Sequence, residues 1–590
     1  REDTSADRQS QYLDVIARLR PGIGLDQARA ELSALGLRFE RQYPNDDAGR
    51  GFTLTPLRED AVGDLRPTLL VLAGAVALIL LIACANVANL FLARAVGRSH
   101  EVAIRVALGA TRARLVRWFL AESLVLAALG GALGLLLASW IAPGLAALAP
   151  RALAAGALQL DLRVLAFTAG LALATAVVFG LVPALHVESP AEALKEAGRT
   201  GTGSVRRARL RSALVVTEVA LSLVLLIGAG LLVRSFARLQ RVDPGFEPAR
   251  VMTADLWLPA AKYPEMAQQA AFFHEVVRRL SAAPGVEAAG DGSRLPLSRG
   301  NSTRSVQPPG SPDKTVDADY RLASPGYFAA LRIPLRAGRG LTDADLQSGA
   351  RVALVNEAFA RRMWPEGDPL GRQIVVTVDA KPVGVVGVIG DVRHLGLQLP
   401  PRPEVYLPEG LEPWPFMSLV VRGKGDLAGL LRASVAAVDR DQPITRLLTM
   451  EQRMADSLAP RRFSVVLVGA LAAVAFVLAV TGIYGVMAYS VAQRTREMGI
   501  RLALGATPAA VLALVLRQAM RLVAAGVALG VAAALPLGRV LRTLLYGVSA
   551  TDPGTFAALA ALLCATAAAA TLIAARRATS VDPALALRAE

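Results

Sequence analysis

Long apolar stretches recur along the chain and dominate its pattern of hydrophobic and polar positions. A helix needs about 20 residues, at ~1.5 Å each, to cross the ~30 Å hydrocarbon layer of a membrane. Ser212–Val233 reaches this length with only Glu218 inside it, and Leu522–Gly538 does so if it extends back past Arg521 and Arg517, which can snorkel. The uncharged stretches are Pro67–Ala93, Ser123–Pro150, Val164–Leu185, Phe463–Gln493 and Pro553–Ala575. The pattern therefore predicts an α-helical multi-pass bundle with seven spans.

Basic residues alternate between the short loops in a way that predicts orientation. The segments 94–117, 186–211, 491–521 and 576–590 together carry 20 Lys or Arg, whereas 142–163 and 536–552 carry 4. Short loops rich in Lys and Arg stay cytoplasmic, while long domains are translocated largely regardless of charge. We therefore expect the amino-terminal segment and the long stretch 236–461 to face outward, with the carboxyl terminus in the cytoplasm.

One fourteen-residue motif occurs twice, 396 residues apart. Residues 98–111 read RSHEVAIRVALGAT and residues 494–507 read RTREMGIRLALGAT, with nine identical positions. A second match relates Pro190–Lys195 to Pro583–Arg588. Self-similarity at a fixed offset indicates repeated structural units. Because both copies are predicted to cross the membrane in the same direction, the repeats are expected to be parallel.

The outward segments show alternating strand and helix patterns. Tyr12–Leu19 and Phe52–Leu57 resemble strands, and Asp26–Arg41 between them has helical spacing. The same order precedes the fifth span, at Met417–Val421, Leu427–Val438 and Ile444–Leu448. If these sets correspond, the second copy carries about 200 residues, one span included, that the first lacks. Since the chain also begins in polar sequence without an initiator Met, we expect a truncated start and eight spans in the intact protein.

The remainder of the outward stretch also reads as α/β. Met252–Leu258, Glu265–Ala282 and Val286–Asp291 predict a second β-α-β set that packs beside the set at 417–448. Between the two sets lies an insertion, Tyr320–Leu407. Within it, Trp364–Pro365 is interpreted as a packing corner and Gly384–Gly390 as part of a buried strand with close backbone contacts.

The repeated motif has the features of a short helix with defined ends. In each copy a glutamate precedes an arginine by four residues, the favoured helical pairing, worth ~0.3–0.5 kcal/mol. A glycine can end the helix, a threonine can cap the next one, and Pro508 can occupy its first position. The motif also presents two apolar side chains one turn apart. In the first copy these residues are Glu101, Arg105, Ile104, Leu108, Gly109 and Thr111, and in the second Glu497, Arg501, Ile500, Leu504, Gly505 and Thr507.

Two interpretations of this motif remain open. A cytoplasmic helix that occurs twice suits a partner with two equivalent pockets, so the motifs are candidate coupling segments. Alternatively each helix lies on the lipid surface, although Ala and Gly supply little apolar area for membrane insertion.

Here the residues resemble a known family, the permease subunits of ABC transporters of the MacB/FtsX type, and most closely the duplicated orphan permeases. The resemblance rests on Ala83–Leu90, on both copies of the motif, on Gly338–Thr342, and on the stretches Val352–Pro365 and Val383–Val392. It covers nearly the whole chain and implies two FtsX-like repeats with an α/β periplasmic domain. It also implies a location in the bacterial inner membrane and a separate cytoplasmic ATPase. Relatives of the MacB type export substrates by transmitting force, with a periplasmic adaptor as a further partner.

The resemblance and the span pattern together divide the chain into seven parts. These are the end of a first periplasmic domain (1–66), a first FtsX-like three-helix unit (67–186), a cytoplasmic linker (187–210), a transmembrane helix (211–235), a second, MacB-like periplasmic domain (236–461), a second FtsX-like three-helix unit (462–577) and a cytoplasmic tail (578–590).

Composition agrees with a membrane protein and offers no catalytic chemistry. The chain is 54% hydrophobic and 19% charged, with a mean hydropathy of +0.44. Its net charge of +16 is attributed mostly to the basic residues that orient the spans in the membrane, and not to nucleic-acid binding. Cys84 and Cys564 both lie in apolar runs, and His100, His186, His274 and His394 lack metal-ligand spacing. A GxxxxGK[S/T] motif does not occur in the 590 residues, so any ATP is expected to be used by a partner, and we expect neither a cofactor nor enzymatic activity in this chain.

Three polar residues lie inside the predicted spans, namely Asn86, Asn89 and Glu218. Burying such groups in lipid is costly, so hydrogen bonding between helices is the expected role. A substrate or proton role for Glu218 is an alternative. At the level of the whole chain, the alternatives to export are an FtsX-like regulator of periplasmic cell-wall hydrolases and a lipoprotein-releasing permease.

Overall fold

The structure is a computed structural model, and it describes residues 15–43, 51–57, 59, 66–97, 105, 111–148, 161–185, 202–298, 300–311, 314–376, 381–412, 414–493, 500–501, 504 and 506–579. The chain divides into two compact units. We call Arg1–Ala61 with Arg241–Leu458 the sheet unit, and Val62–Gln240 with Ala459–Glu590 the helical unit.

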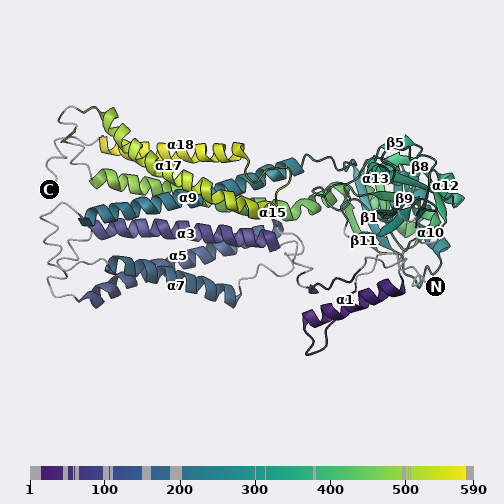
Figure 1. The fold of residues 1–590 in the computed structure, drawn as a ribbon, viewed down its shortest axis with the longest axis horizontal. Helices are drawn as coiled ribbons and strands as arrows, with labels where there is room; N and C mark the ends of the chain where they lie inside the picture. The colour runs from purple at the N-terminus through teal and green to yellow at the C-terminus, as the bar shows by residue number, and fades with distance from the viewer. Residues whose placement is uncertain are drawn as a thin grey trace. The chain divides into compact units, whose positions relative to one another are not determined.

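The helical unit contains a helix at each of the seven predicted spans (Figure 1). Six of these helices are long and apolar enough to cross a membrane, while α7 contributes a shorter described apolar stretch, Leu162–Val177. The short sixth span begins at Pro508, which confirms the extension past Arg517 and Arg521. The helices are α3 (Arg66–Gly97), α5 (Arg112–Leu148), α7 (Leu162–Leu185), α9 (Thr202–Leu239), α15 (Met450–Gln493), α17 (Pro508–Leu541) and α18 (Pro553–Thr579).

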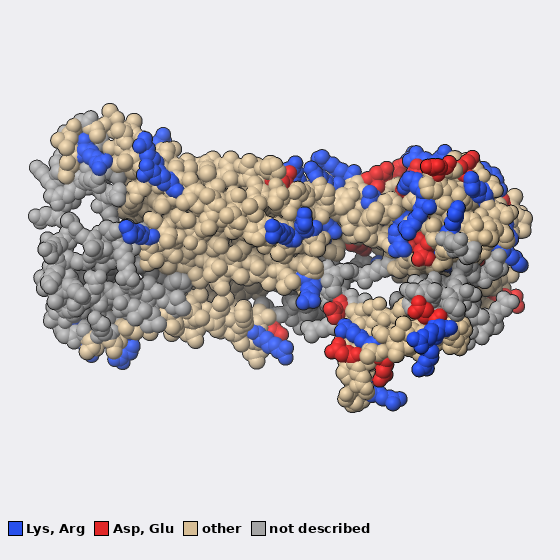
Figure 2. All heavy atoms as spheres, in the orientation of Figure 1, with Lys and Arg blue, Asp and Glu red and all other residues tan. Residues whose placement is uncertain are grey.

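Helix α9 is the most enclosed of the six spans. Within its apolar window 67% of the residues are buried, against 0% in α5. Val219, Leu223 and Ile227 of α9 belong to a core that includes residues of α15, α17 and α18, and other α9 side chains pack with Ile82 of α3. The repeated motif follows α3 in the first repeat and α15 in the second, so α3 and α15 are equivalent helices. The predicted span without such a counterpart, α9, therefore lies among helices of both repeats. Figure 2 shows the middle of the helical unit free of charged atoms on the visible face, as a membrane-spanning region requires.

The sheet unit begins with a four-stranded antiparallel sheet in the order β11-β1-β10-β2. Its strands are β1 (Val251–Trp257), β2 (Val286–Gly292), β10 (Phe416–Gly423) and β11 (Ile444–Thr449). The two crossover helices are α10 (Met266–Ser281) and α14 (Leu427–Val438), which pack on each other and on this sheet. Both predicted β-α-β sets are therefore present, and the pairing of β1 with β10 joins them as expected.

The inserted subdomain is a closed ring of six strands. Its order is β4-β3-β7-β8-β6-β9, and β9 pairs in parallel with β4 to close the ring. β5 pairs with β8 beside the ring. The strands are β3 (Thr303–Gln307), β4 (Val316–Ala323), β5 (Leu335–Gly338), β6 (Val352–Asn356), β7 (Gln373–Val376), β8 (Pro382–Ile389) and β9 (Glu404–Pro408). The predicted insertion, Tyr320–Leu407, began too late, because β3 and the first half of β4 precede Tyr320. Short helical segments connect these strands: α11 (Pro325–Leu331), α12 (Asp343–Gln347), α13 (Glu357–Met363) and η4 (Glu409–Leu411).

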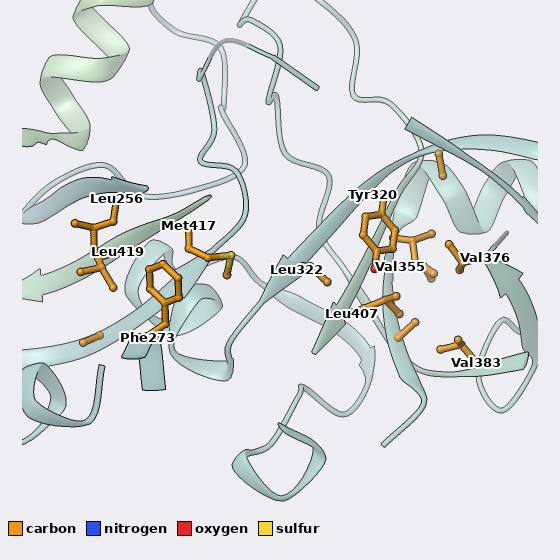
Figure 3. Close-up of a cluster of buried hydrophobic side chains, with 14 of the residues drawn as sticks. Leu256, Phe273, Tyr320, Leu322, Val355, Val376, Val383, Leu407, Met417 and Leu419 are labelled. Carbon is orange, nitrogen blue, oxygen red and sulfur yellow. The ribbon is translucent and has the colours of Figure 1, made fainter. Parts of the chain in front are cut away.

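Apolar residues fill both subdomains of the sheet unit. Figure 3 shows Phe273, Met417 and Leu419 at the four-stranded sheet, and Val355 and Val383 in the ring. β8 covers most of the predicted glycine-rich strand. A side chain at Gly387 would place its Cβ 2.3 Å from the carbonyl oxygen of Arg339, so the expected close backbone contact is confirmed. Trp364 caps the end of α13 and packs edge-on to Phe359, as a packing corner does.

A buried polar network holds the parallel pair that closes the ring. Arg321 on β4 donates to a carboxylate oxygen of Glu404 on β9 at 3.0 Å, and the Tyr406 hydroxyl donates to the other oxygen at 2.6 Å. Burial raises the pKa of Glu404 to about 7, although Arg321 opposes the shift. His394 lies 2.9 Å from the same hydroxyl, and burial holds its pKa well below the usual value.

At the amino terminus the helix prediction is confirmed and the strand predictions are wrong. α1 (Leu25–Gln42) matches the expected helix. The described part of the first expected strand, Val15–Leu19, and the residues Phe52–Pro56 form no strand, while Tyr12–Asp14 lie outside the described residues. A strand needs a neighbour for its backbone N–H and C=O groups. No described strand pairs with either segment, and Val15 and Ile16 are largely exposed.

Candidate coupling segments and buried polar cluster

The structure describes four of the ten residues predicted for the coupling segments. Arg105 lies with its guanidinium carbon 4.1 Å from the ring centre of Trp118, at the start of α5. Ile500 and Leu504 are 45% and 82% exposed, and the backbone N–H of Leu504 donates to the Ile500 carbonyl at 2.9 Å. One helical turn thus presents two apolar side chains on the surface of the helical unit. The predicted residues Glu101, Ile104, Leu108, Gly109, Glu497 and Gly505 lie outside the described residues.

The described residues of the second segment form a helical end shortly before α17 begins. The N–H of Ala506 donates to the carbonyl of Arg501 at 2.9 Å, which is the six-residue closure typical of a glycine-terminated helix. The hydroxyl of Thr507 then accepts from the N–H of Ala510, and Pro508 occupies the first position of α17. The expected threonine cap and proline are therefore present, and they fix the start of α17 two residues after the turn.

A buried polar cluster joins α3, α9 and α15 inside the helical unit. The amide nitrogen of Asn86 on α3 donates to the carbonyl of Leu478 on α15 at 3.1 Å. Glu218 on α9 is fully buried. A Cβ built at Gly482 on α15 would lie 2.3 Å from a carboxyl oxygen of Glu218 and 2.4 Å from the amide oxygen of Asn86. Both polar side chains therefore end in the space left by a missing side chain.

Two further polar groups adjoin this cluster. Ser222, one turn along α9 from Glu218, donates to the carbonyl of Ala475 on α15 at 3.1 Å. Asn89 is buried, and its amide atoms find no hydrogen-bond partner among the described residues. Asn86 and Glu218 thus end at the same space beside Gly482, although the Glu218 carboxyl oxygens, like the Asn89 amide, have no hydrogen-bond partner among the described residues.

Sequence reasoning missed Gly482 and Ser222. Glycine and serine are common in apolar helices, so neither stands out there. One signal could have identified Gly482, because it lies 396 residues after Asn86, the offset of the repeated motif. The first repeat supplies a polar side chain at this position and the second supplies the space that receives it.

Comparison with protein families matches most of the chain. Residues 73–189 and 469–583 match the FtsX-like permease C-terminal domain, and residues 212–445 match the MacB-like periplasmic core domain. The chain belongs to the MacB/FtsX type of ABC transporter permease. The two FtsX-like matches of this permease begin 396 residues apart, which confirms the internal duplication.

Individual relatives are distant and cover part of the permease. It is 26% identical over 205 residues to the uncharacterized ABC transporter permease YknZ of Bacillus subtilis, covering 33% of this chain and 51% of the relative. It is 23% identical over 254 residues to the macrolide export ATP-binding/permease protein MacB of Mannheimia succiniciproducens, covering 41% and 38%. The chain thus spans about half the length, or less, of these curated relatives.

The solved periplasmic region of MacB from Actinobacillus actinomycetemcomitans matches with a TM-score of 0.27 and 14% identity, covering 35% of this chain and 92% of that structure. The extracellular domain of YknZ from Gram-positive bacteria matches with a TM-score of 0.25 and 16% identity, covering 33% and 99%.

Proposed function

We propose that this chain is a permease subunit that couples ATP hydrolysis by a separate cytoplasmic ATPase to motion of its sheet unit, and that this motion drives export across the cell envelope. The main support for the proposal is that the candidate coupling segment is present in two copies. It occurs once in each FtsX-like repeat, immediately before α5 and immediately before α17. In the second copy it presents Ile500 and Leu504 on the surface.

The ends of this segment support a mechanical role. A push on the turn at Ile500–Leu504 reaches α17 through only two residues, because Thr507 and Pro508 begin the helix directly. α17 packs along α9, and α9 continues to Leu239, just before the first residue of the sheet unit. Motion of a rigid helix is transmitted to whatever is attached to its end.

The second connection to the sheet unit is also a helix. α15 begins at Met450, immediately after β11 ends at Thr449, and it runs unbroken to Gln493. One continuous helix therefore joins the last strand of the sheet to a membrane span. Pro460 lies inside this helix, and a helix bends most easily at a proline. The match of residues 212–445 to the MacB-like periplasmic core domain favours export over hydrolase regulation. A periplasmic adaptor that binds the sheet unit is a further part of this proposal.

Co-purification of the ATPase tests the proposal. The tagged chain is isolated from its native membrane, and retained ATPase subunits are identified by mass spectrometry. We expect the double variant Glu101→Arg with Glu497→Arg to lose the ATPase, because the charge of both coupling segments changes. The matched control, Glu366→Arg with Glu451→Arg, makes the same charge change at exposed positions outside the coupling segments and should retain it. Equal recovery from both variants would refute the coupling assignment.

A second experiment separates export from regulation of a cell-wall hydrolase. The chain and its ATPase are reconstituted in vesicles that contain a labelled compound. ATP-dependent release supports export, whereas ATP hydrolysis without release, combined with a cell-wall hydrolase bound to the chain, would identify a regulator instead.

A further inference from the structure

A buried arginine binds the linker through which the chain passes from α9 into the four-stranded sheet. This entry linker, residues 240–250, lies between the end of α9 and the start of β1. The guanidinium of Arg422 on β10 donates to the carbonyl of Glu247 at 2.6 Å and to that of Ala249 at 2.8 Å. Its Nε donates to the carbonyl of Ala330 on α11 at 2.7 Å. One side chain therefore ties the entry linker to β10 and to α11.

Three further features hold the entry linker against the rest of the sheet unit. The N–H of Glu247 donates to the carbonyl of Leu331 at 2.9 Å. Gly245 has a φ of +82°, and a Cβ added there would lie 2.0 Å from the carbonyl oxygen of Asp391, so the linker lies directly against the segment after β8. Arg250, next to β1, has a φ of 58°, which non-glycine residues adopt at a cost. The linker is thus held in one path between α9 and β1.

A second buried arginine binds the place where the chain leaves the sheet. Arg453 lies in the first turn of α15, directly after β11. Its Nε donates to the hydroxyl of Thr253 on β1 at 2.7 Å, and its Nη2 forms an ion pair with the carboxylate of Asp255 on the same strand at 2.8 Å. The Thr253 hydroxyl in turn donates to the carbonyl of Leu448 on β11 at 2.7 Å. The start of α15 is therefore bound to β1 as well as continuous with β11.

Both arginines act on the same pair of strands. Arg422 lies opposite Val251, the first residue of β1, and Asp255 lies opposite Ser418 of β10, whose hydroxyl donates to the Asp255 carboxylate at 2.8 Å. Burying a guanidinium is costly, and apolar side chains would fill the same volume without that cost. Its planar fork of donors, however, can bind several acceptors from different segments at once. Stability alone therefore gives little reason for a buried arginine at each connection.

We propose that Arg422 and Arg453 are positioning residues that fix the entry linker and the start of α15 to β1 and β10, so that movement arriving through α9 and α15 displaces the sheet as one body. Without these bonds the linker and the junction of β11 with α15 would absorb part of the movement, because loops and helix ends open more easily than paired strands. The inference rests on the proposed coupling function, and it names the residues through which that function reaches the sheet.

The ratio of compound released to ATP hydrolysed tests the inference, in vesicles that contain the full chain and its ATPase. We expect Arg422→Met and Arg453→Met to hydrolyse ATP at the parent rate and to lower this ratio about fivefold or more, as for loss of a typical coupling between distant sites. The matched control is Arg304→Met. Arg304 is 5% exposed, against 1% and 4% for Arg422 and Arg453, but its guanidinium is bound by Glu412 within the same unit, so the ratio should not change.

Two additions keep the test decisive if a methionine variant does not fold. Arg422→Lys and Arg453→Lys keep the buried charge but lose the planar fork, and they should lower the ratio in the same direction. Hydrogen exchange should become faster at residues 241–250 in the Arg422 variants and at residues 450–453 in the Arg453 variants, while Arg304→Met leaves both segments protected.

The possible results separate this inference from the proposed function. If the parent chain couples release to ATP hydrolysis and the variants at Arg422 and Arg453 keep the parent ratio, the inference is overturned and the proposed function stands. An equal fall in Arg304→Met would also overturn it, because a general loss of stability would then explain the result. ATP hydrolysis without release by the parent chain would refute the proposed function, and this inference with it.

Discussion

At the scale of single residues, the polar cluster depends on an absent side chain. Asn86 and Glu218 both end where Gly482 has no Cβ, so the position accepts nothing larger than glycine without moving one of them. The two side chains lie between closely packed helices, which limits how far either side chain can move.

We predict that Gly482→Ala destabilises the helical unit by ~1–3 kcal/mol, the usual cost of overpacking a filled interior. Gly485→Ala, one turn away on the same helix, meets nothing within 4 Å and serves as the control. Thermal unfolding of the purified chain in detergent measures both. An unchanged midpoint for Gly482→Ala, or an equal fall in both variants, would contradict the cluster.

A second residue-scale prediction concerns Asp345 in the sheet unit. Its carboxylate accepts two hydrogen bonds from Arg339, at 2.6 and 3.0 Å, and forms a capping box with Thr342. These bonds, that from Arg339 first, lower the pKa of Asp345 to about 2. Because the pKa is lower in the folded state, the stabilisation is present above the unfolded value near 3.8 and is lost as the pH falls toward 2.

Asp345→Asn should therefore cost ~1–2 kcal/mol of unfolding free energy at pH 7, and this cost should shrink as the pH approaches 2. Urea unfolding at several pH values measures it, with Asp343→Asn, an exposed acid in the same helix, as the control. A cost that does not change with pH would show that the capping geometry, and not the charge, stabilises α12.

Sequence reasoning identified single residues only where their chemistry contrasts with their surroundings. Asn86 and Glu218 stand out because they interrupt apolar stretches. Gly482 does not. The pair of Arg321 and Glu404, 83 residues apart, could not be recognised because it exists only once β4 and β9 lie side by side. Contacts of that kind depend on how the ring closes, and local patterns do not encode it.

At the scale of elements, the cap of α17 ties the coupling segment to its span. The Thr507 hydroxyl accepts a hydrogen bond from one of the first N–H groups of the helix, which otherwise lack a partner. We predict that Thr507→Ala weakens the first turn by ~1 kcal/mol, whereas Thr507→Ser leaves it intact. Faster hydrogen exchange at the first amides of α17 in the alanine variant alone would support the cap, and equal protection in all three proteins would refute it.

Element predictions succeeded where burial imposes a period or a length. Seven apolar runs gave seven helices, because a span must satisfy its own backbone in lipid. Both later β-α-β sets were also found. The strands expected at 12–19 and 52–57 failed because a strand pattern is realised only beside a partner, and β3 was missed because its five residues alternate too briefly to stand out.

At the scale of the whole molecule, the permease is two FtsX-like repeats with one unrepeated helix, α9, among them and one MacB-like domain between them in sequence. The repeated motif and its offset were readable in the sequence. The central position of α9 was not, because it depends on contacts between helices, such as the close approach of Gly526 on α17 to Val219 on α9, that exist only in the folded chain.

Membrane sidedness tests the central claim most directly, since the coupling segments can receive force from a cytoplasmic ATPase only if they lie on the opposite side from the sheet unit. Single cysteines are placed at Leu504 and at Trp257, which are 82% and 63% exposed, in a chain carrying Cys84→Ala and Cys564→Ala. In spheroplasts of a Gram-negative host, an impermeant maleimide should label Leu504→Cys only after the membrane is permeabilised, and Trp257→Cys without permeabilisation. Labelling of Leu504→Cys in intact spheroplasts would contradict the account.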